Sequence, residues 1–260
     1  MPRNNGASRR GFLRAASAAA GTFVLGGCDA LSQAPWFRKV LYSAERLTVL
    51  TQRAVLAEGD VAREYTEADL SPKFRANGST SPDDPAYVAM AQNGFADWKL
   101  KVEGLVEDPT EFSLADLRAM PSRTQITRHD CVEGWSCIGK WKGVPLNHVL
   151  GLVKLKPEAR YLVFHCADAL EKTLDNSGIY YESIGLDDAF HAQTILAYEM
   201  NGQVLPIAHG APIRLRVERQ LGYKMAKYVM RIEAVNSFAD ISGGYGGFWE
   251  DRGYEWYAGI

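Results

Sequence analysis

The chain has 260 residues, of which 47% are hydrophobic, 23% charged and 11% aromatic. Such a composition is typical of a globular protein and excludes a disordered or fibrous one, and the length suits one large domain or two small ones. The net charge is −2, and beyond residue 27 there are 25 basic and 31 acidic residues, which argues against nucleic acid as the main partner.

Residues 1–27 have the pattern of an export signal. Arg9 and Arg10 precede Gly11-Phe12-Leu13 and resemble a twin-arginine signal. The apolar stretch that follows, 15–27, is too short to span a bilayer and fits the apolar region of a signal peptide. The twin-arginine route exports proteins that are already folded, as a protein with an inserted cofactor must be. We therefore expect the protein in the bacterial periplasm.

The signal ends in a sequence that resembles a bacterial lipobox. Leu25-Gly26-Gly27 precedes Cys28, whose thiol would be the acylation site, and Asp29 favours retention at the inner membrane. We expect lipidation of Cys28, which would tether the protein to the membrane surface. The alternative is a plain secretory signal with an incidental cysteine at its end.

Beyond the signal, the sequence predicts a helical arm and one main domain. Apolar spacing predicts a helix over 37–58, within an arm of residues 28–70. The main domain is expected over 71–260. Its first part, 71–97, is rich in Pro, Asp, Asn, Gly and Ser and is interpreted as a long ordered loop.

Short strands and helices alternate through the main domain. Ser113 is the predicted N-cap of a short helix, and a second helix is expected over 145–153. The tail, 243–260, is loop-rich and aromatic. This pattern predicts an α+β fold with mainly antiparallel sheets and short helices. Strands are predicted at 98–104, 125–128, 161–166, 194–200, 213–218 and 228–235.

The cysteines of the main domain are Cys131, Cys137 and Cys166, an odd number. At least one thiol therefore stays unpaired in an oxidising compartment. Within the segment 127–141, Cys131 and Cys137 could form a disulfide that closes a small loop. The sequence gives less support to a zinc site, because Cys-x5-Cys lacks the usual spacing of zinc ligands. The other interpretations are a metal site of another kind and ordinary sheet packing that includes some polar residues.

Three segments together resemble one family. Residues 131–136, Cys-Val-Glu-Gly-Trp-Ser, resemble the metal-ligand segment of sulfite-oxidase-type molybdopterin-dependent oxidoreductases. The segment 196–214 resembles the second motif of that family, and 221–233 resembles the third. The branch with the greatest likeness is the catalytic subunit of the periplasmic methionine-sulfoxide reductase. The resemblance runs from about Leu70 to the C-terminus.

The resemblance implies the fold of the sulfite-oxidase molybdopterin domain and a cofactor of molybdenum with molybdopterin. A soft thiolate suits this metal, so Cys131 is the expected ligand. The cofactor ends in a phosphate, which needs hydrogen-bond donors and positive charge when it is buried. The expected cofactor-binding residues are Asn77, Cys131, Cys166, His209, Arg214, Met225, Ala226 and Lys227. Arg75 is a weaker candidate than Asn77 for the position over the metal.

These assignments have plainer alternatives. Arg214 and Lys227 could be surface charges on strands, and Cys137 and Cys166 are interpreted as buried small apolar residues. By its position, Cys166 could line the pterin pocket with its backbone.

Glu133 and Tyr180 complete the expected catalytic set with Cys131. Ionised, Glu133 would repel sulfite; desolvated, it could stay protonated and donate a proton to a departing oxygen. Both effects favour reduction of a neutral oxide over sulfite oxidation. The phenol of Tyr180 could hydrogen-bond substrate. The alternatives are a salt-bridged glutamate and a packed core tyrosine.

We therefore expect an exported oxidoreductase that transfers an oxygen atom, reducing an S-oxide or N-oxide. The chain contains no Cys-x-x-Cys-His haem motif, so electrons are expected from a separate haem-bearing membrane subunit or cytochrome. One alternative is sulfite-type oxidation with the same cofactor. Alternatives of another class are a catalytically silent, membrane-tethered binding lipoprotein and a disulfide-stabilised structural β-domain.

Overall fold

The computed structural model describes residues 34–55, 60–175 and 177–260, and the chain divides into two units, Met1–Leu56 and Ala57–Ile260. The expected signal and Cys28 lie outside the described residues. None of the described helices combines the length and the apolar character that crossing a membrane requires.

The smaller unit contains the helix α2, Pro35–Val55. It agrees with the helix predicted over 37–58 up to residue 55, and residues 56–59 lie outside the described part of the chain. Apolar side chains at Trp36, Val40 and Leu47 are more than half exposed.

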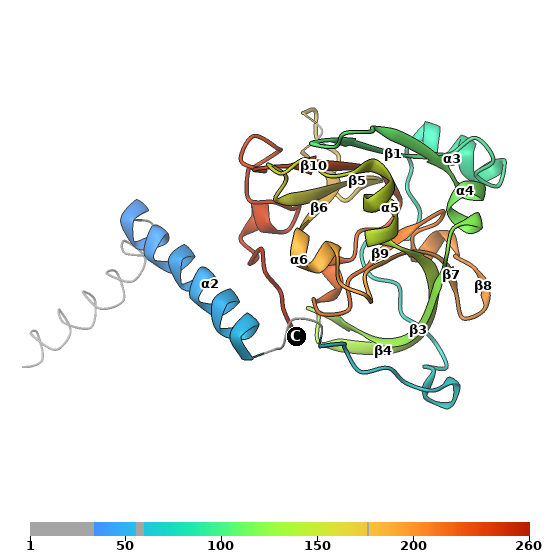
Figure 1. The fold of residues 1–260 in the computed structure, drawn as a ribbon, viewed down its shortest axis with the longest axis horizontal. Coiled ribbons are helices and arrows are strands. Elements are labelled where there is room, and N and C mark those ends of the chain that lie inside the picture. The colour runs from blue at the N-terminus through green and yellow to red at the C-terminus, as the bar shows by residue number, and fades with distance from the viewer. Residues whose placement is uncertain (1–33, 56–59, 176) are drawn as a thin grey trace, which may run out of the picture. The chain divides into compact units, whose positions relative to one another are not determined.

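The larger unit contains two five-stranded sheets (Figure 1). The strand order of the first sheet is β2-β1-β10-β5-β6, and its β1–β10 pair is parallel whereas the others are antiparallel. Its strands are β2 Thr110–Ser113, β1 Lys99–Gly104, β10 Val229–Val235, β5 Tyr161–Ala169 and β6 Ile179–Gly185.

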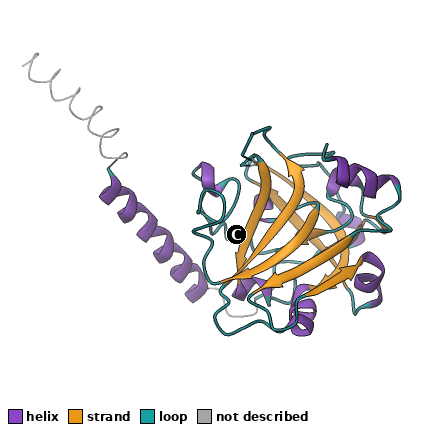
Figure 2. Cartoon of the chain, turned by 90° about the horizontal axis from the view of Figure 1, so that it is seen from above, coloured by secondary structure: helices purple, strands orange, loops and turns teal. Residues whose placement is uncertain are grey.

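The second sheet is antiparallel throughout. Its order is β3-β4-β7-β8, and β9 also pairs with β7. Figure 2 shows the strands gathered in the middle of this unit, with its short helices around them. The strands are β3 Arg123–Cys131, β4 Trp135–Pro145, β7 Ile195–Met200, β8 Gln203–Val204 and β9 Arg214–Arg216.

The helices of this unit are short. Ser113 caps α4 as predicted: its hydroxyl accepts from the backbone N–H of Asp116, and the Asp116 carboxylate accepts from the Ser113 N–H. The α-helices are α3 Pro85–Gln92, α4 Leu114–Ala119, α5 Leu146–Val153 and α6 Leu186–Ala189. The 3-10 helices are η1 Glu67–Asp69, η2 Ile207–His209, η3 Gly222–Lys224 and η4 Glu250–Arg252.

The α+β class with mainly antiparallel sheets is confirmed, but the segment 71–97 is not all loop. Asp84 accepts a hydrogen bond from the N–H of Tyr87, and Pro85 occupies the first helical position, so α3 begins there. Tyr87 is buried and its hydroxyl donates to the carbonyl of Ala211 at 2.7 Å. This segment is therefore attached to the domain by α3.

The main core is formed by the first sheet and the helices packed on it. Buried side chains from β1, β5, β10 and α5 make one continuous cluster. A smaller cluster surrounds Trp141 on β4, against Phe74 and Leu205. Burial of these apolar surfaces, at about 25 cal/mol per Å², is the main driving force for bringing the two sheets together.

Candidate active site

Cys131 lies at the end of β3, directly before a three-residue hairpin loop. It pairs with Trp135, the first residue of β4, and the N–H of Gly134 donates to the Cys131 carbonyl at 3.0 Å. Gly134 has φ +84°, a left-handed conformation that glycine adopts without strain. Because β3 is paired along its full length, the turn fixes the thiol at one edge of the second sheet.

A pocket opens over Cys131, where ends of the two sheets meet. Val132 and Glu133 line it beside Cys131, and Asp168 and Tyr180 line it from the first sheet. The rest of the wall is formed by Leu170, which follows β5, and by three further segments: 77–79, 223–227, and the tail residues Trp249 and Tyr254.

The thiols of Cys131, Cys137 and Cys166 are all free, so the disulfide interpretation is wrong. Burial raises the pKa of the Cys131 thiol, while a hydrogen bond from the backbone of Glu133 opposes this rise. Among the described residues, no group of three or more His, Cys, Asp or Glu side chains is arranged to bind a metal ion. Cys131 is therefore not part of a metal-binding cluster of that size in the described part of the chain.

Positive groups gather below the pocket. Arg214 on β9 is fully buried, and its guanidinium donates only weakly to the carbonyls of His209 at 3.2 Å and Met225 at 3.4 Å. Burial, followed by the neighbouring Arg216, lowers the pKa of Arg214 to about 9. Burial, Arg214 and Lys227 lower the pKa of His209 to about 4.

Lys227 connects this cationic region to the loop 77–79. Its ammonium donates to the carbonyls of Asn77 at 2.6 Å, Ser79, and Ala208 at 3.4 Å. Burial and Arg214 lower the pKa of Lys227 to about 7, against the opposing effect of Asp168. The side-chain oxygen of Asn77 is buried without a partner.

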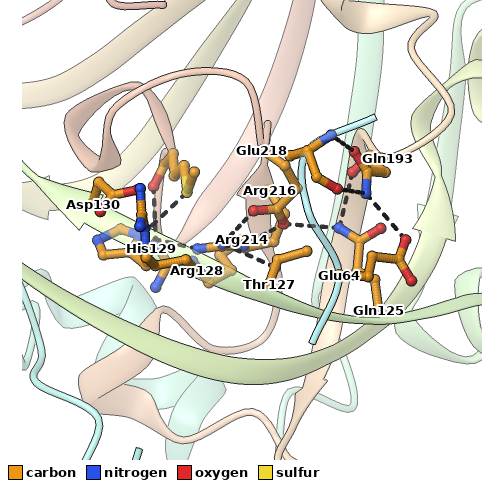
Figure 3. Close-up of polar contacts among 12 residues, drawn as sticks. Glu64, Gln125, Thr127, Arg128, His129, Asp130, Gln193, Arg214, Arg216 and Glu218 are labelled. Atoms are coloured by element: carbon orange, nitrogen blue, oxygen red, sulfur yellow. Dashed lines mark hydrogen bonds and ion pairs between the residues drawn. The ribbon is translucent and has the colours of Figure 1, made fainter. Parts of the chain in front are cut away.

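Two residues along β9 from Arg214, Arg216 is paired. It donates to both carboxylate oxygens of Glu218, at 2.9 and 2.6 Å, and its Nη1 donates to Nδ1 of His129 at 2.9 Å (Figure 3). Arginine has only donors, so Nδ1 accepts and the imidazole hydrogen is on Nε2. Burial and Arg216 lower the pKa of His129 well below its usual value.

His129 fits closely against the third motif. A Cβ atom at Gly222 would lie 2.4 Å from Nε2 of His129, so only glycine allows this approach. Nε2 of His129, Nδ1 of His209 and Nε of Arg214 are buried without a hydrogen-bond partner. Leaving buried donors unpaired is costly.

These residues fit a cofactor with an anionic tail. Unpaired donors and lowered pKa values mark a region that lacks negative charge, and a buried phosphate dianion would supply it. The soft thiolate ligand at Cys131 and the donors at His209, Arg214 and Lys227 suit a molybdenum atom and a phosphate, respectively. The surface-charge interpretation of Arg214 and Lys227 is wrong, because both side chains are buried.

Glu133 lies at the mouth of the pocket but is not desolvated. Its side chain is 56% exposed, lies 3.6 Å from Arg75 in an ion pair, and accepts from the indole N–H of Trp135 at 2.9 Å. The guanidinium of Arg75 also lies over the Trp135 ring. The burial that the proton-donor role required is therefore absent. Glu133 is salt-bridged, but at the pocket and not away from it as the alternative stated.

The side chain of Tyr180 is buried and lines the pocket, and its hydroxyl donates to the carbonyl of Tyr223. Its ring stacks on Phe248 at a centroid separation of 5.7 Å. Since the hydroxyl hydrogen is already used, Tyr180 could offer an incoming ligand only an acceptor lone pair in this arrangement.

The remaining expected residues lie around the pocket in different ways. Met225 lines it, whereas Ala226 is buried and its carbonyl accepts from the N–H of Leu215. Cys166 is buried with its thiol toward the carbonyl of Phe164, and it is Asp168, two residues on, that lines the pocket. The expected set thus gathers in one region, with Cys166 behind it.

Sequence reasoning missed Asp168, Arg75 as a partner of Glu133, and the tail residues at the pocket. Burial raises the pKa of Asp168 to about 7, although Lys227 opposes the shift, and one of its oxygens is unpaired. Alternation along β5 could have placed Asp168 on the face of Cys166. Nothing local in the sequence indicates the other contacts, which join segments far apart in the chain.

The chain is similar to known proteins over most of its length. The sequence model of the oxidoreductase molybdopterin binding domain matches residues 87–240. The chain is 36% identical over 252 residues to a putative protein-methionine-sulfoxide reductase subunit, YedZ1, of Azospira oryzae, covering 97% of this chain and 88% of the relative.

Two other relatives are named as catalytic subunits of protein-methionine-sulfoxide reductase, MsrP. That of Ralstonia nicotianae is 37% identical (60% of this chain, 49% of the relative), and that of Campylobacter jejuni is 32% identical (65% and 60%). The chain thus spans about half to three fifths of their length. A solved structure, the sulfane dehydrogenase SoxCD from Paracoccus pantotrophus, is 26% identical with a TM-score of 0.48, covering 55% of this chain and 39% of that one.

Proposed function

This chain belongs to the family of the oxidoreductase molybdopterin binding domain, and from that premise we propose that it reduces methionine sulfoxide to methionine. It is a molybdopterin-dependent oxidoreductase. The overall reaction consumes two electrons and two protons, breaks the S–O bond, and releases the thioether and one water molecule. When bound, the cofactor supplies a metal that can accept the oxygen atom and pass on the electrons.

The observation that supports reduction of a neutral oxide is the charge balance at the pocket mouth. Arg75 and Glu133 form an ion pair there, with side chains 63% and 56% exposed, so the mouth presents no net positive charge to collect sulfite. Deeper in the pocket, Lys227 is bound to backbone carbonyls of the loop 77–79 and adjoins the region assigned to the cofactor phosphate.

The residues of the chain have distinct parts in this proposal. Cys131 is the protein ligand of the metal, and binding requires its thiol to lose a proton. His209, Arg214 and Lys227 bind the anionic tail, with backbone of Met225 and Ala226 alongside. Asn77 faces the pocket beside Lys227. Since Glu133 is exposed, protons can also reach the mouth directly from water.

Sulfite oxidation is the second candidate, and Arg75 is the residue that favours it. The sequence between Cys131 and Arg160 contains no arginine, but the fold brings Arg75 to the mouth from a distant segment. Arg75→Met would leave Glu133 without a cationic partner and should weaken any sulfite turnover, while changing sulfoxide turnover little.

The deciding experiment uses full-length protein purified from a host that makes the cofactor. Reduction of methionine sulfoxide and of trimethylamine N-oxide is measured with reduced viologen dye as the electron donor. Oxidation of sulfite is measured separately, with ferricyanide as the electron acceptor. We expect about one molybdenum per chain and rapid dye oxidation with methionine sulfoxide. If fully loaded protein oxidised sulfite but reduced neither oxide, the result would contradict the proposal. Cys131→Ser is the matched control and should contain no stably bound metal.

We also propose that the protein is exported to the periplasm, lipidated at Cys28, and supplied with electrons by a separate haem protein. The paired arginines and the cysteine at the end of the signal support this. Mass spectrometry of the N-terminal peptide from membranes tests it: a diacylglycerol-modified Cys28 is expected. An unmodified, soluble mature chain would contradict the anchor.

A further inference from the structure

The tail of the chain contributes an aromatic face to the pocket. Trp249 and Tyr254 line it, and their rings stack with centroids 5.3 Å apart and an interplanar angle of 28°. Tyr223 meets Tyr254 edge to face at 5.4 Å. Both tail residues lie beyond residue 240, where the match to the family ends. This part of the pocket wall is therefore built outside the shared domain.

The tail has little regular structure of its own to fix this face. Its only described helix is the three-residue η4, Glu250–Arg252, next to Trp249. An isolated bridge joins Gly247 to Glu182 on β6, and the N–H of Phe248 donates to the carbonyl of Tyr181 at 3.0 Å. Beyond Tyr254, an isolated bridge joins Gly259 to Gln220, and the N–H of Leu221 donates to the carbonyl of Ala258 at 2.9 Å. Side-chain interactions add to these backbone attachments.

A group of three charged side chains, here called the charged triad, lies behind the aromatic face. It consists of Lys224 on η3, Glu182 on β6 and Glu250 on η4, all essentially inaccessible to water. The ammonium of Lys224 is 2.5 Å from Glu182 Oε1 and also donates to Glu250 Oε1. One cation thus joins an edge strand of the sheet, the third motif and the tail.

The members of the triad influence one another electrostatically. Burial and the Glu250 carboxylate raise the pKa of Glu182 well above its usual range. Burial disfavours the charged form of Lys224, but the two carboxyl groups outweigh it and raise the pKa of Lys224. The triad therefore places one ammonium between two buried carboxyl groups. Removing one member of such a group leaves a buried charge without a partner, which is strongly destabilising.

Each member of the triad is close in sequence to a residue that lines the pocket. Lys224 follows Tyr223, Glu250 follows Trp249, and Glu182 lies two residues after Tyr180 on the same face of β6. A shift of the triad would therefore move the aromatic face directly.

We propose that Trp249 and Tyr254 contact the sulfoxide substrate and determine specificity for it, and that the charged triad positions them. This rests on the proposed function, because it assigns the recognition of that substrate. Stacked rings suit the apolar arms of a neutral thioether oxide, and sulfur and methyl groups pack favourably on aromatic rings. The two rings carry no charge that would bind the sulfite anion.

The test compares variants of the loaded, full-length enzyme with methionine sulfoxide and with the smaller dimethyl sulfoxide. Trp249→Ala leaves the triad intact and should raise KM for methionine sulfoxide roughly ten-fold or more, with kcat and molybdenum content little changed. The effect on dimethyl sulfoxide should be smaller. Unchanged KM in fully loaded Trp249→Ala would overturn the contact.

Lys224→Met should raise the same KM, because it leaves the acids without their cation. Replacing all three members, as Lys224→Met with Glu182→Gln and Glu250→Gln, removes the unpaired charge and should restore KM to within about three-fold of the wild type. Lys154→Met, which breaks the exposed Lys154–Asp108 pair, is the matched control and should change nothing. Loss of molybdenum and kcat in Lys224→Met, with no change in KM and no rescue, would overturn the positioning role.

A binding measurement separates this inference from the proposed function. Methionine sulfone, which resembles the substrate, is titrated calorimetrically into loaded wild type and Trp249→Ala. Failure of the wild type to reduce any sulfoxide would contradict the proposed function. Equal sulfone affinity in both proteins, with active wild type, would contradict only the assignment of the aromatic face.

Discussion

Arg214 and Arg216 lie two residues apart on the same short strand, and their surroundings differ sharply. Both are fully buried, and both guanidinium groups lie over the ring of Trp141, at 5.0 and 4.4 Å. Arg216 has a carboxylate partner in Glu218, whereas Arg214 has only weak contacts with carbonyls. A buried arginine that is paired with a carboxylate, such as Arg216, stabilises the fold. A buried arginine without a carboxylate partner, such as Arg214, indicates where an anion binds.

Arg216→Met is the change expected to have the largest effect on stability. It leaves the Glu218 carboxylate buried without its cation and removes the donor to His129, so the free energy of unfolding should fall by about 3–5 kcal/mol. Urea unfolding of the cofactor-free protein measures this. The double variant with Glu218→Gln should recover much of the loss. Equal stability of Arg216→Met and wild type would contradict the pairing.

Arg214→Met should affect cofactor binding and not the stability of the cofactor-free protein. Because Arg214 has no carboxylate partner, the cofactor-free protein should be as stable as wild type or slightly more so. Cofactor affinity should fall by about 1.5–3 kcal/mol, the value of a hydrogen bond to a charged group. Fluorescence of the oxidised pterin released from purified protein measures the retained cofactor. Full pterin content in Arg214→Met would show that the anion lies elsewhere.

Acidification should destabilise the cofactor-free protein, because His209, near Arg214, is neutral in the folded protein at neutral pH. The folded pKa of His209 is about 4, below its unfolded value of 6.5, so between these pH values the unfolded chain binds more protons. Stability should therefore fall as pH drops from 6.5 to 4, by up to about 1.4 kcal/mol per pH unit for this group. His209→Asn should flatten the profile measured by urea unfolding.

Breaking the exposed Arg75–Glu133 ion pair should have the smallest effect on stability among these changes. Both side chains are more than half exposed, so breaking the pair with Arg75→Met should cost about 0–1 kcal/mol of stability. High salt should make the variant and the wild type indistinguishable. A loss as large as that of Arg216→Met would mean that exposure is a poor guide to the value of an ion pair here.

The sequence predicts those elements whose pattern is local. Apolar alternation identifies β1, β5, β7 and β10, and the cap at Ser113 identifies the start of α4. It does not indicate β6, because Glu182 and Ser183 interrupt the apolar pattern and are buried with partners from other segments. It does not indicate β4, where Gly and Lys alternate with aromatic residues.

The same limit applies to the site. The short motif at Cys131 and the spacing of the later motifs point to the cofactor. The pairing of Glu133 with Arg75, and of Lys224 with Glu250, depends on contacts between segments that only the folded chain brings together. The proton-donor role expected of Glu133 required burial, which spacing cannot supply. The electrostatic roles of these residues therefore require the tertiary structure, whereas the kind of cofactor can be predicted from the sequence.

The position of β10 has a consequence for biosynthesis. It is the last strand of its sheet to leave the ribosome, yet it lies at the centre, paired with β1 on one side and β5 on the other. Until residues 229–235 are made, the β2–β1 and β5–β6 pairs have no strand to join them. A nascent or truncated chain would therefore display two open edges, which chaperones and proteases recognise, and only the finished chain can assemble the sheet.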